Sequence, residues 1–235
     1  MNVEIWSDVM CPFCYIGKRK FEKALAQFPH KDKVNVIWKS FQLDPTTITD
    51  PTLNTIDNLA QKKGWSKEQA DQTIAHVTGI AKQVGLDFHF EKAVVANSLD
   101  AHRLSHLAKK YGKQNELEEK LFSAYFIEGK NTADFNTLLQ IATELGLDKT
   151  EVSALLKSNT YTNEVYHDIK QAQQIGVNGV PFFLLDNKYA VSGAQESETF
   201  LGALTKAYEE HLLKNNFETV TSSPSDSCGS DGCEI

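Results

Sequence analysis

The sequence has few cysteines, no surplus of basic residues and no long apolar run. Its 24 Lys and Arg stand against 31 Asp and Glu, giving a formal net charge of −7. This balance argues against a nucleic-acid partner, because phosphate-binding surfaces depend on clustered cations. No stretch approaches the ~18 apolar residues that a membrane span needs. We therefore expect a protein that binds neither nucleic acid nor membrane.

The N-terminus lacks the features of a secretory signal. Its first residues, MNVEIWSDVMCP, contain Glu4 and Asp8 but neither a basic start nor an apolar run. We therefore expect a cytoplasmic location. With 235 residues, 41% of them hydrophobic, the chain is long enough to bury a full core. The sequence leaves the oligomeric state open.

The four cysteines form two close pairs at opposite ends of the chain. Cys11 and Cys14 stand near the N-terminus, Cys228 and Cys233 stand near the C-terminus, and none lies between the pairs. In a reducing compartment such pairs indicate redox or metal chemistry more than a structural disulfide framework.

The hydrophobic pattern predicts an α/β fold interrupted by a helical segment. Residues 2–7 alternate with period two, 11–28 carry a helical apolar stripe, and 34–43 are typical of a second strand. Glycine-punctuated helical patterns follow. These helices are predicted at 53–63, 66–84, 97–111, 115–128, 134–145 and 149–157, with boundaries uncertain by several residues.

The strand pattern returns near the C-terminus. A helix is predicted over 159–175, then a hairpin from 182–186 and 189–192, and a closing helix over 196–213. We therefore divide the chain into a first fold segment (1–50), a helical insertion (51–157), a second fold segment (158–214) and a tail (215–235). The polar tail is expected to be flexible.

The tetrapeptide CPFC, residues 11–14, follows the first predicted strand and opens the first predicted helix. A helix N-terminus stabilises anions, so this position favours a thiolate at Cys11. Cys14 lies one helical turn further on, close enough to displace a mixed disulfide formed at Cys11. Pro12 suits the first helical turn. A zinc knuckle or two ordinary buried thiols are the alternatives, but the strand-to-helix placement favours redox chemistry.

A second motif, GVNGVPFF, places Val180 and Pro181 directly before a predicted strand. Proline cannot donate a ladder hydrogen bond, so it belongs at a strand start or edge. A plain loop proline is the alternative explanation.

Five stretches together carry a family resemblance: SDVMCPFCYIGK (7–18), NSLDAHRL (97–104), LFSAYFIEG (121–129), GVNGVPFF (176–183) and SGAQ (192–195). They resemble the DsbA-like family that includes FrnE-type oxidoreductases. Its relatives are 2-hydroxychromene-2-carboxylate isomerases and kappa-class glutathione transferases. The resemblance covers nearly all of residues 1–213 and implies a thioredoxin-like α/β fold with a large all-helical insertion.

The resemblance also implies a reaction and its residues. Cys11 is expected to attack a substrate disulfide and Cys14 to resolve the mixed disulfide. Val180 and a cis-Pro181 are expected to face this pair and bind extended substrate through the backbone, beside Pro12 and Phe13. Protein or small-molecule thiols and disulfides are the expected partners. No metal or organic cofactor is required, although glutathione could serve as a co-substrate.

Phe13 departs from the pattern of the oxidising periplasmic relatives, which carry histidine at this position. Without that neighbour the thiolate should be stabilised less, so we expect a milder redox couple, suited to isomerase or reductase work.

Four polar residues have both a functional and an ordinary explanation. Asp8 could influence proton transfer or simply be an exposed residue at a strand end. Lys18 could attract glutathione, or be one more surface lysine. His102 and Arg103 could form an active-site pair, but bridging between helices is the favoured explanation.

Cys228 and Cys233, in CGSDGC, could form a disulfide and relay electrons to Cys11 and Cys14. Incidental oxidation or metal binding is the alternative. Two rival functions also stay open. One is a glutathione-dependent isomerase or transferase, for which Cys14 would be dispensable. The other is a zinc-binding module that uses all four cysteines.

Overall fold

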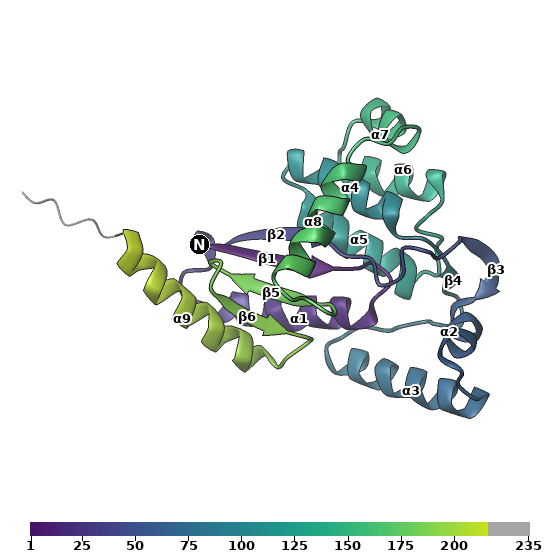
Figure 1. Ribbon diagram of the computed structural model, residues 1–235, viewed down its shortest axis with the longest axis horizontal. Helices are drawn as coiled ribbons and strands as arrows, with labels where there is room; N and C mark the ends of the chain where they lie inside the picture. The colour runs from purple at the N-terminus through teal and green to yellow at the C-terminus, as the bar shows by residue number, and fades with distance from the viewer. Residues whose placement is uncertain (216–235) are drawn as a thin grey trace, which may run out of the picture.

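The computed structural model describes residues 1–215 and is built on a four-stranded sheet in the order β2-β1-β5-β6 (Figure 1). Strand β1 (Asn2–Ser7) pairs parallel with β2 (Asn35–Ser40) and antiparallel with β5 (Phe182–Leu185). Strand β6 (Tyr189–Ser192) pairs antiparallel with β5. The first strand, β1, is therefore in the middle of the sheet, and its two neighbours, β2 and β5, are far apart from each other in the sequence.

Period-two alternation in β1 sorts its side chains between the two faces of the sheet. Val3 and Ile5 belong to the main core, to which α1 (Pro12–Gln27) and α9 (Ser197–Asn215) contribute. Trp6 points to the opposite face and packs with Ala172 of α8 (Thr162–Gln174). Its indole N–H donates to the Asp168 carbonyl at 2.9 Å, so α8 is fixed to the sheet by a polar contact as well.

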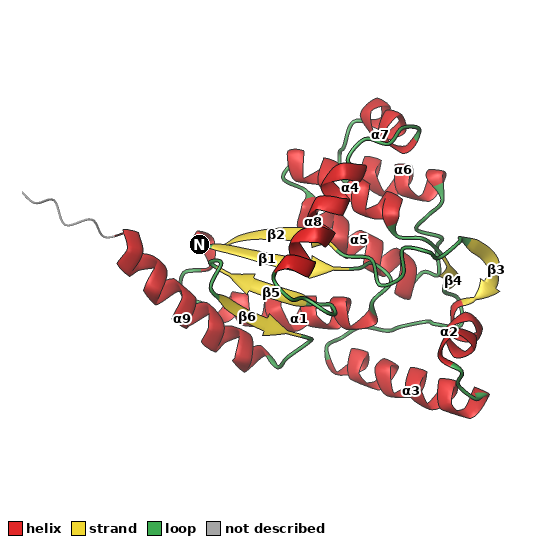
Figure 2. Cartoon of the chain, viewed as in Figure 1, coloured by secondary structure: helices red, strands yellow, loops and turns green. Residues whose placement is uncertain are grey.

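Helices fill most of the chain between β2 and α8, as the sequence predicts (Figure 2). They are α2 (Thr55–Lys63), α3 (Lys67–Gln83), α4 (Leu99–Lys110), α5 (Gln114–Phe126), α6 (Phe135–Glu144) and α7 (Lys149–Leu156). A short 3₁₀ helix, η1 (Lys31–Lys33), precedes β2. The aromatic residues of α5, among them Phe122 and Phe126, are buried in the core.

The helical segment also holds a small antiparallel sheet, formed by β3 (Asp50–Asn54) and β4 (Val94–Val95). The expectation of an all-helical insertion is wrong at this point. The two strands are about 40 residues apart in sequence, so local periodicity carries no signal of their pairing. The helix predicted from residue 53 begins after Asn54, whose side chain caps α2 by accepting from the Ile56 N–H at 2.7 Å.

A second correction concerns the start of α8. The apolar stripe predicted a helix from residue 159, but Tyr161 adopts a left-handed conformation with φ 66° and the helix begins at Thr162. Within residues 1–215 no helix is long and apolar enough to cross a membrane. Cys228 and Cys233 lie outside the described residues.

Candidate active site

Cys11 is the N-cap residue of α1, and Pro12 occupies the first helical turn. The Cys11 N–H donates to the Asp8 carbonyl at 2.9 Å, and the Cys14 N–H donates to the Cys11 carbonyl at 3.0 Å. This tight path leads the chain from β1 into α1 and directs both side chains inward. Both thiols are free and buried. The CPFC motif thus has the strand-to-helix position that its sequence predicts.

Val180 and Pro181, 169 residues further along the chain, lie against this helix start. The peptide bond between them is cis. The Cys11 thiol donates to the Val180 carbonyl at 3.5 Å. Pro181 leads into β5, which pairs with β1, so the sheet itself brings the two motifs together.

Gly17 makes room for this contact one turn after Cys14. A Cβ atom at this position would lie 2.9 Å from Cγ of Pro181 and 3.5 Å from Cβ of Ala194. The absence of a side chain at Gly17 therefore allows α1 to approach the Pro181 loop closely.

The Gly17→Ala variant is expected to move the Pro181 loop away from Cys11. Overpacking should outweigh the gain in helix propensity, lowering the unfolding free energy by about 1 kcal/mol. Reaction of Cys11 with a disulfide peptide should slow as well. The matched control is Gly79→Ala in α3, where a Cβ meets nothing within 4 Å, and which should stabilise the protein by about 0.5–1 kcal/mol. Urea unfolding measures the unfolding free energy of both variants. An equal loss of unfolding free energy in Gly17→Ala and Gly79→Ala would contradict the packing argument.

Burial raises the pKa of the Cys14 thiol well above its ordinary value, and the neighbouring Cys11 raises it further. The Ser7 hydroxyl and the Asp8 backbone act in the opposite direction and lower this pKa. Cys14 is therefore held as a neutral thiol at neutral pH. The sequence analysis did not identify Ser7, which looks like one more residue of an alternating strand.

Asp8 is buried, at 2% exposed, which excludes the exposed strand-end explanation. Its carboxylate accepts from the backbone N–H groups of Leu43 at 2.7 Å and Met10 at 3.2 Å. His102 Nε2 lies 3.5 Å from the same carboxylate. Burial lowers the pKa of His102, but Asp8 and Glu118 outweigh it and the net shift is upward. A buried acid–base pair thus stands directly behind the CPFC turn.

Arg103 does not join this pair. Its guanidinium donates to the carbonyls of Leu155 at 2.6 Å and Thr160 at 2.8 Å, and it also pairs with Asp100. These contacts close the C-terminal end of α7, which is the structural role that the sequence analysis favoured for Arg103.

Lys18 is not a surface lysine, because its side chain is only 2% exposed. Its ammonium pairs with Glu22 at 2.6 Å and Glu119 at 2.7 Å. Glu119 also accepts from Arg19 and from the Tyr15 hydroxyl. Burial raises the pKa of Glu119, but the hydrogen bonds from Arg19 and Lys18 outweigh it and lower the pKa to about 2. Lys18 is thus committed to this ion cluster.

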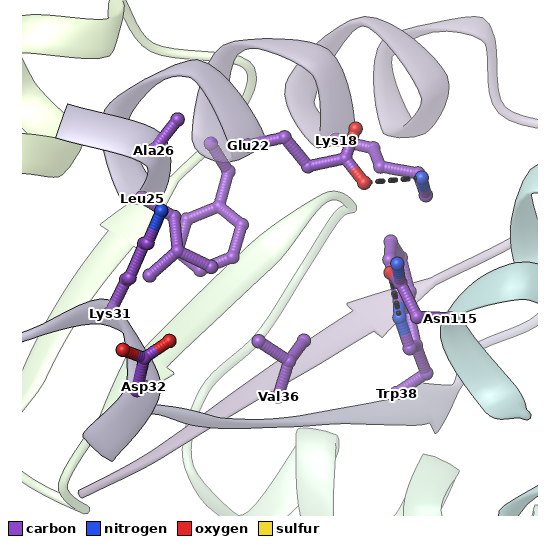
Figure 3. Close-up of a pocket in the computed structure, with 10 residues that line it drawn as sticks. Lys18, Glu22, Leu25, Ala26, Lys31, Asp32, Val36, Trp38 and Asn115 are labelled. Carbon is purple, nitrogen blue, oxygen red and sulfur yellow. Dashed lines mark hydrogen bonds and ion pairs between the residues drawn. The ribbon is translucent and has the colours of Figure 1, made fainter. Parts of the chain in front are cut away.

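A cavity of about 390 Å³ lies between α1 and β2 (Figure 3). Figure 3 places Lys18 and Glu22 of α1 on one side and Val36 and Trp38 of β2 on another. Neither Cys11 nor Cys14 lines it. This cavity is therefore separate from the thiol pair.

The surface beside the thiols is apolar. Phe13 is 39% exposed and Leu43 is 52% exposed, whereas most large apolar side chains of the protein are buried. Pro12, which directly precedes Phe13, is half-buried. Among the described residues, no group of three or more His, Cys, Asp or Glu could hold a metal ion.

Comparison with known proteins places this geometry in a family. A model of the DSBA-like thioredoxin domain matches residues 2–205. An uncharacterised protein of Bacillus subtilis, YwbO, is 28% identical over 207 residues, covering 87% of this chain and 96% of the relative.

Three solved structures share the fold. A probable DsbA oxidoreductase from Streptomyces coelicolor has a TM-score of 0.84 and 39% identity, covering 100% of this chain and 99% of that one. A 2-hydroxychromene-2-carboxylate isomerase has a TM-score of 0.65 and 16% identity, covering 92% and 100%. The cytosolic disulfide reductase DsbM of Pseudomonas aeruginosa, solved with glutathione, has a TM-score of 0.62 and 15% identity, covering 91% and 100%.

Proposed function

Because the chain belongs to the DsbA-like thioredoxin domain family, we propose that it is a thiol–disulfide oxidoreductase whose reacting groups are Cys11 and Cys14. The observation that carries the proposal is the contact between the Cys11 thiol and the Val180 carbonyl at 3.5 Å. It brings the CPFC turn and the Pro181 loop to one place, beside two free thiols.

The proposed reaction has two exchange steps. The Cys11 thiolate attacks one sulfur of a substrate disulfide, forms a mixed disulfide and releases the other substrate sulfur as a thiolate. Cys14 then attacks the Cys11 sulfur, which forms the Cys11–Cys14 disulfide and releases the second substrate sulfur. The proton of Cys14 ends on a released substrate thiolate. The substrate is reduced by two electrons and the protein is oxidised by two.

The backbone at Val180 supplies a means of holding the substrate. Its carbonyl accepts from the Cys11 thiol in the reduced protein. Once Cys11 is in a mixed disulfide it no longer has a proton to donate, so this carbonyl becomes free to accept from a substrate backbone N–H. Pro12 and Phe13 lie beside the same point, and the exposed Phe13 ring offers apolar contact to residues that flank a substrate cysteine.

The proposed setting is the cytoplasm, where the glutathione pool would supply or accept electrons and set the direction of exchange. Phe13 in place of histidine supports a mild couple. This agrees with a FrnE-like, reductase or isomerase role on protein or small-molecule disulfides. The cytosolic reductase DsbM, which shares only the fold, was solved with glutathione, so glutathione is a reasonable co-substrate to test.

The proposal is tested by thiol trapping and mass spectrometry across glutathione redox buffers. Wild type should show a disulfide between Cys11 and Cys14, and Cys14→Ser should instead accumulate glutathione on Cys11. Both proteins are also prepared with Cys228→Ser and Cys233→Ser, which removes the second pair and reveals any relay by it.

Three results would overturn the proposal. Bound zinc that requires all four cysteines would identify a metal-binding module. Noncovalent glutathione with activity that survives in Cys14→Ser would identify an isomerase or transferase. Absence of the Cys11–Cys14 disulfide at every buffer potential would exclude exchange by this pair.

A further inference from the structure

Three buried side chains in the part of the chain that the structure describes have a polar atom without a hydrogen-bond partner. They are the hydroxyls of Ser7 and Thr132 and the Nε2 atom of His102, which makes no hydrogen bond although it lies 3.5 Å from the Asp8 carboxylate. A buried polar group without a partner carries a desolvation cost, so each one needs an explanation. Ser7 directly precedes Asp8 in the chain.

The position of Ser7 in β1 places its side chain on the face of the sheet that α1 covers. Ser7 follows Val3 and Ile5 at steps of two, so it shares their face of the sheet. Val3, Ile5 and Cys14 belong to the same buried cluster, on the face where α1 packs. Ser7 is only 2% exposed and Cys14 only 1%, so both side chains lie in the interior, away from bulk water.

We propose that Ser7 is a positioning residue for the second exchange step, in which its hydroxyl donates a hydrogen bond to the Cys14 sulfur when that sulfur becomes a thiolate. A hydroxyl rotates to suit its acceptor, and a thiolate is a much stronger acceptor than a thiol. The unpartnered hydroxyl of the reduced protein thus gains its partner during the reaction. This inference rests on the proposed function.

The atoms and electrons of the step balance without Ser7 changing its own protonation. Cys14 first loses its proton to the buffer, and its thiolate then attacks the Cys11 sulfur, so that the substrate sulfur leaves as a thiolate that takes up a proton in turn. The Cys11–Cys14 bond forms as the bond between Cys11 and the substrate breaks. Ser7 keeps its proton throughout and stabilises the negative charge on Cys14 before the attack.

Titratable groups from the CPFC turn and from α4 and α5 lie around Cys14 and Asp8. Cys11 shares the CPFC turn with Cys14 and raises the Cys14 pKa, whereas Ser7 lowers it. Asp8 follows β1, with His102 of α4 beside its carboxylate. Glu118 of α5 is fully buried and accepts from Ser105 at 2.6 Å. Since Ser7→Ala leaves these groups in place, its effect isolates the hydroxyl.

The test uses the full chain carrying Cys228→Ser and Cys233→Ser, with oxidised glutathione as substrate. Rapid acid quenching and mass spectrometry follow the glutathione adduct on Cys11 as it forms and decays, from pH 6 up to the highest pH at which circular dichroism shows both the parent protein and Ser7→Ala folded. Where no plateau is reached, the pH displacement of the two rate profiles is compared. Ser7→Ala should slow the decay about 3- to 10-fold at pH 7.5, because a smaller thiolate fraction is only partly offset by greater nucleophilicity. The pH midpoint of the decay should rise by about 1 unit or more.

The matched control is Thr132→Val, which removes another buried unpartnered hydroxyl, located between α5 and α6. It should leave both the decay rate and its pH midpoint unchanged. An unchanged midpoint in Ser7→Ala, with the adduct still forming and decaying, would overturn the role of Ser7 alone. Failure of the adduct to form in the parent protein would instead contradict the proposed function.

Discussion

Replacing Cys11 by serine is expected to lower the rate of disulfide reduction by at least about 10³-fold. The hydroxyl of serine is a far poorer nucleophile than a thiolate, and an oxygen cannot form the mixed disulfide that both exchange steps require. Serine is nearly isosteric with cysteine, and its hydroxyl can donate to the Val180 carbonyl as the Cys11 thiol does, so the fold should be retained. The rate is measured with a fluorogenic diglutathione substrate in a glutathione buffer.

The control for this variant is Cys14→Ser, which keeps the attacking sulfur. It should still form the first adduct at a rate close to wild type, but should fail to release it. If Cys11→Ser keeps a substantial rate, the chemistry belongs to the remaining thiols, Cys14, Cys228 and Cys233, and the assignment of Cys11 is wrong.

Replacing Glu119 by alanine is expected to lower the unfolding free energy by about 2–3 kcal/mol. The change removes a carboxylate that pairs with Lys18 and Arg19 and accepts from Tyr15. Lys18 is only 2% exposed, so loss of one of its two partners leaves a poorly compensated buried charge. Glu119 itself is 31% exposed, which places the cost below that of a fully buried pair. Urea unfolding at neutral pH measures it.

The matched control lies on the same helix. Glu116 is 46% exposed and pairs with Lys113 at 3.0 Å, so Glu116→Ala should cost less than about 0.5 kcal/mol. Equal losses of unfolding free energy in the two variants would show that removing any carboxylate from α5 has this effect. The ion cluster would then contribute no additional stability.

The pH dependence of stability has a definite sign at Glu119. Its pKa is lowered from 4.5 to about 2, so the folded protein binds a proton less readily here than the unfolded chain. The stabilisation is therefore complete above pH 4.5 and is lost as the pH falls toward 2. Glu119→Gln should lose this part of the pH profile, and an unchanged profile between pH 5 and 2 would assign the acid sensitivity to other carboxylates.

The helices and the strands of the main sheet are predictable because each has a local signal. Alternation in residues 2–7 and the apolar stripe after Cys11 depend only on neighbours in sequence. The small sheet of β3 and β4 has no such signal, since its two strands meet across a long helical stretch. The left-handed conformation of Tyr161 also cannot be predicted from hydrophobic periodicity.

The residues of the candidate site also fall into two groups, those that a local motif identifies and those that only the folded structure reveals. Cys11, Cys14 and Pro181 stand in recognisable motifs, so the sequence identifies them. Lys18 was misjudged, because its burial depends on Glu119 from a helix about 100 residues away. Ser7 carries no signal of its own, since its relation to Cys14 follows from how α1 packs on the sheet. Burial and charge pairing across distant segments are properties of the folded chain that local patterns do not contain.

The central position of β1 has a consequence for biosynthesis. Its second neighbour, β5, consists of residues 182–185, so the Val180 carbonyl reaches Cys11 only after the 169 residues that separate them have been made. Domains fold from the N-terminus during synthesis, but long-range strand pairing must wait for both strands. Cys11 and Cys14 therefore leave the ribosome well before the segment that completes the surface presenting them to a substrate.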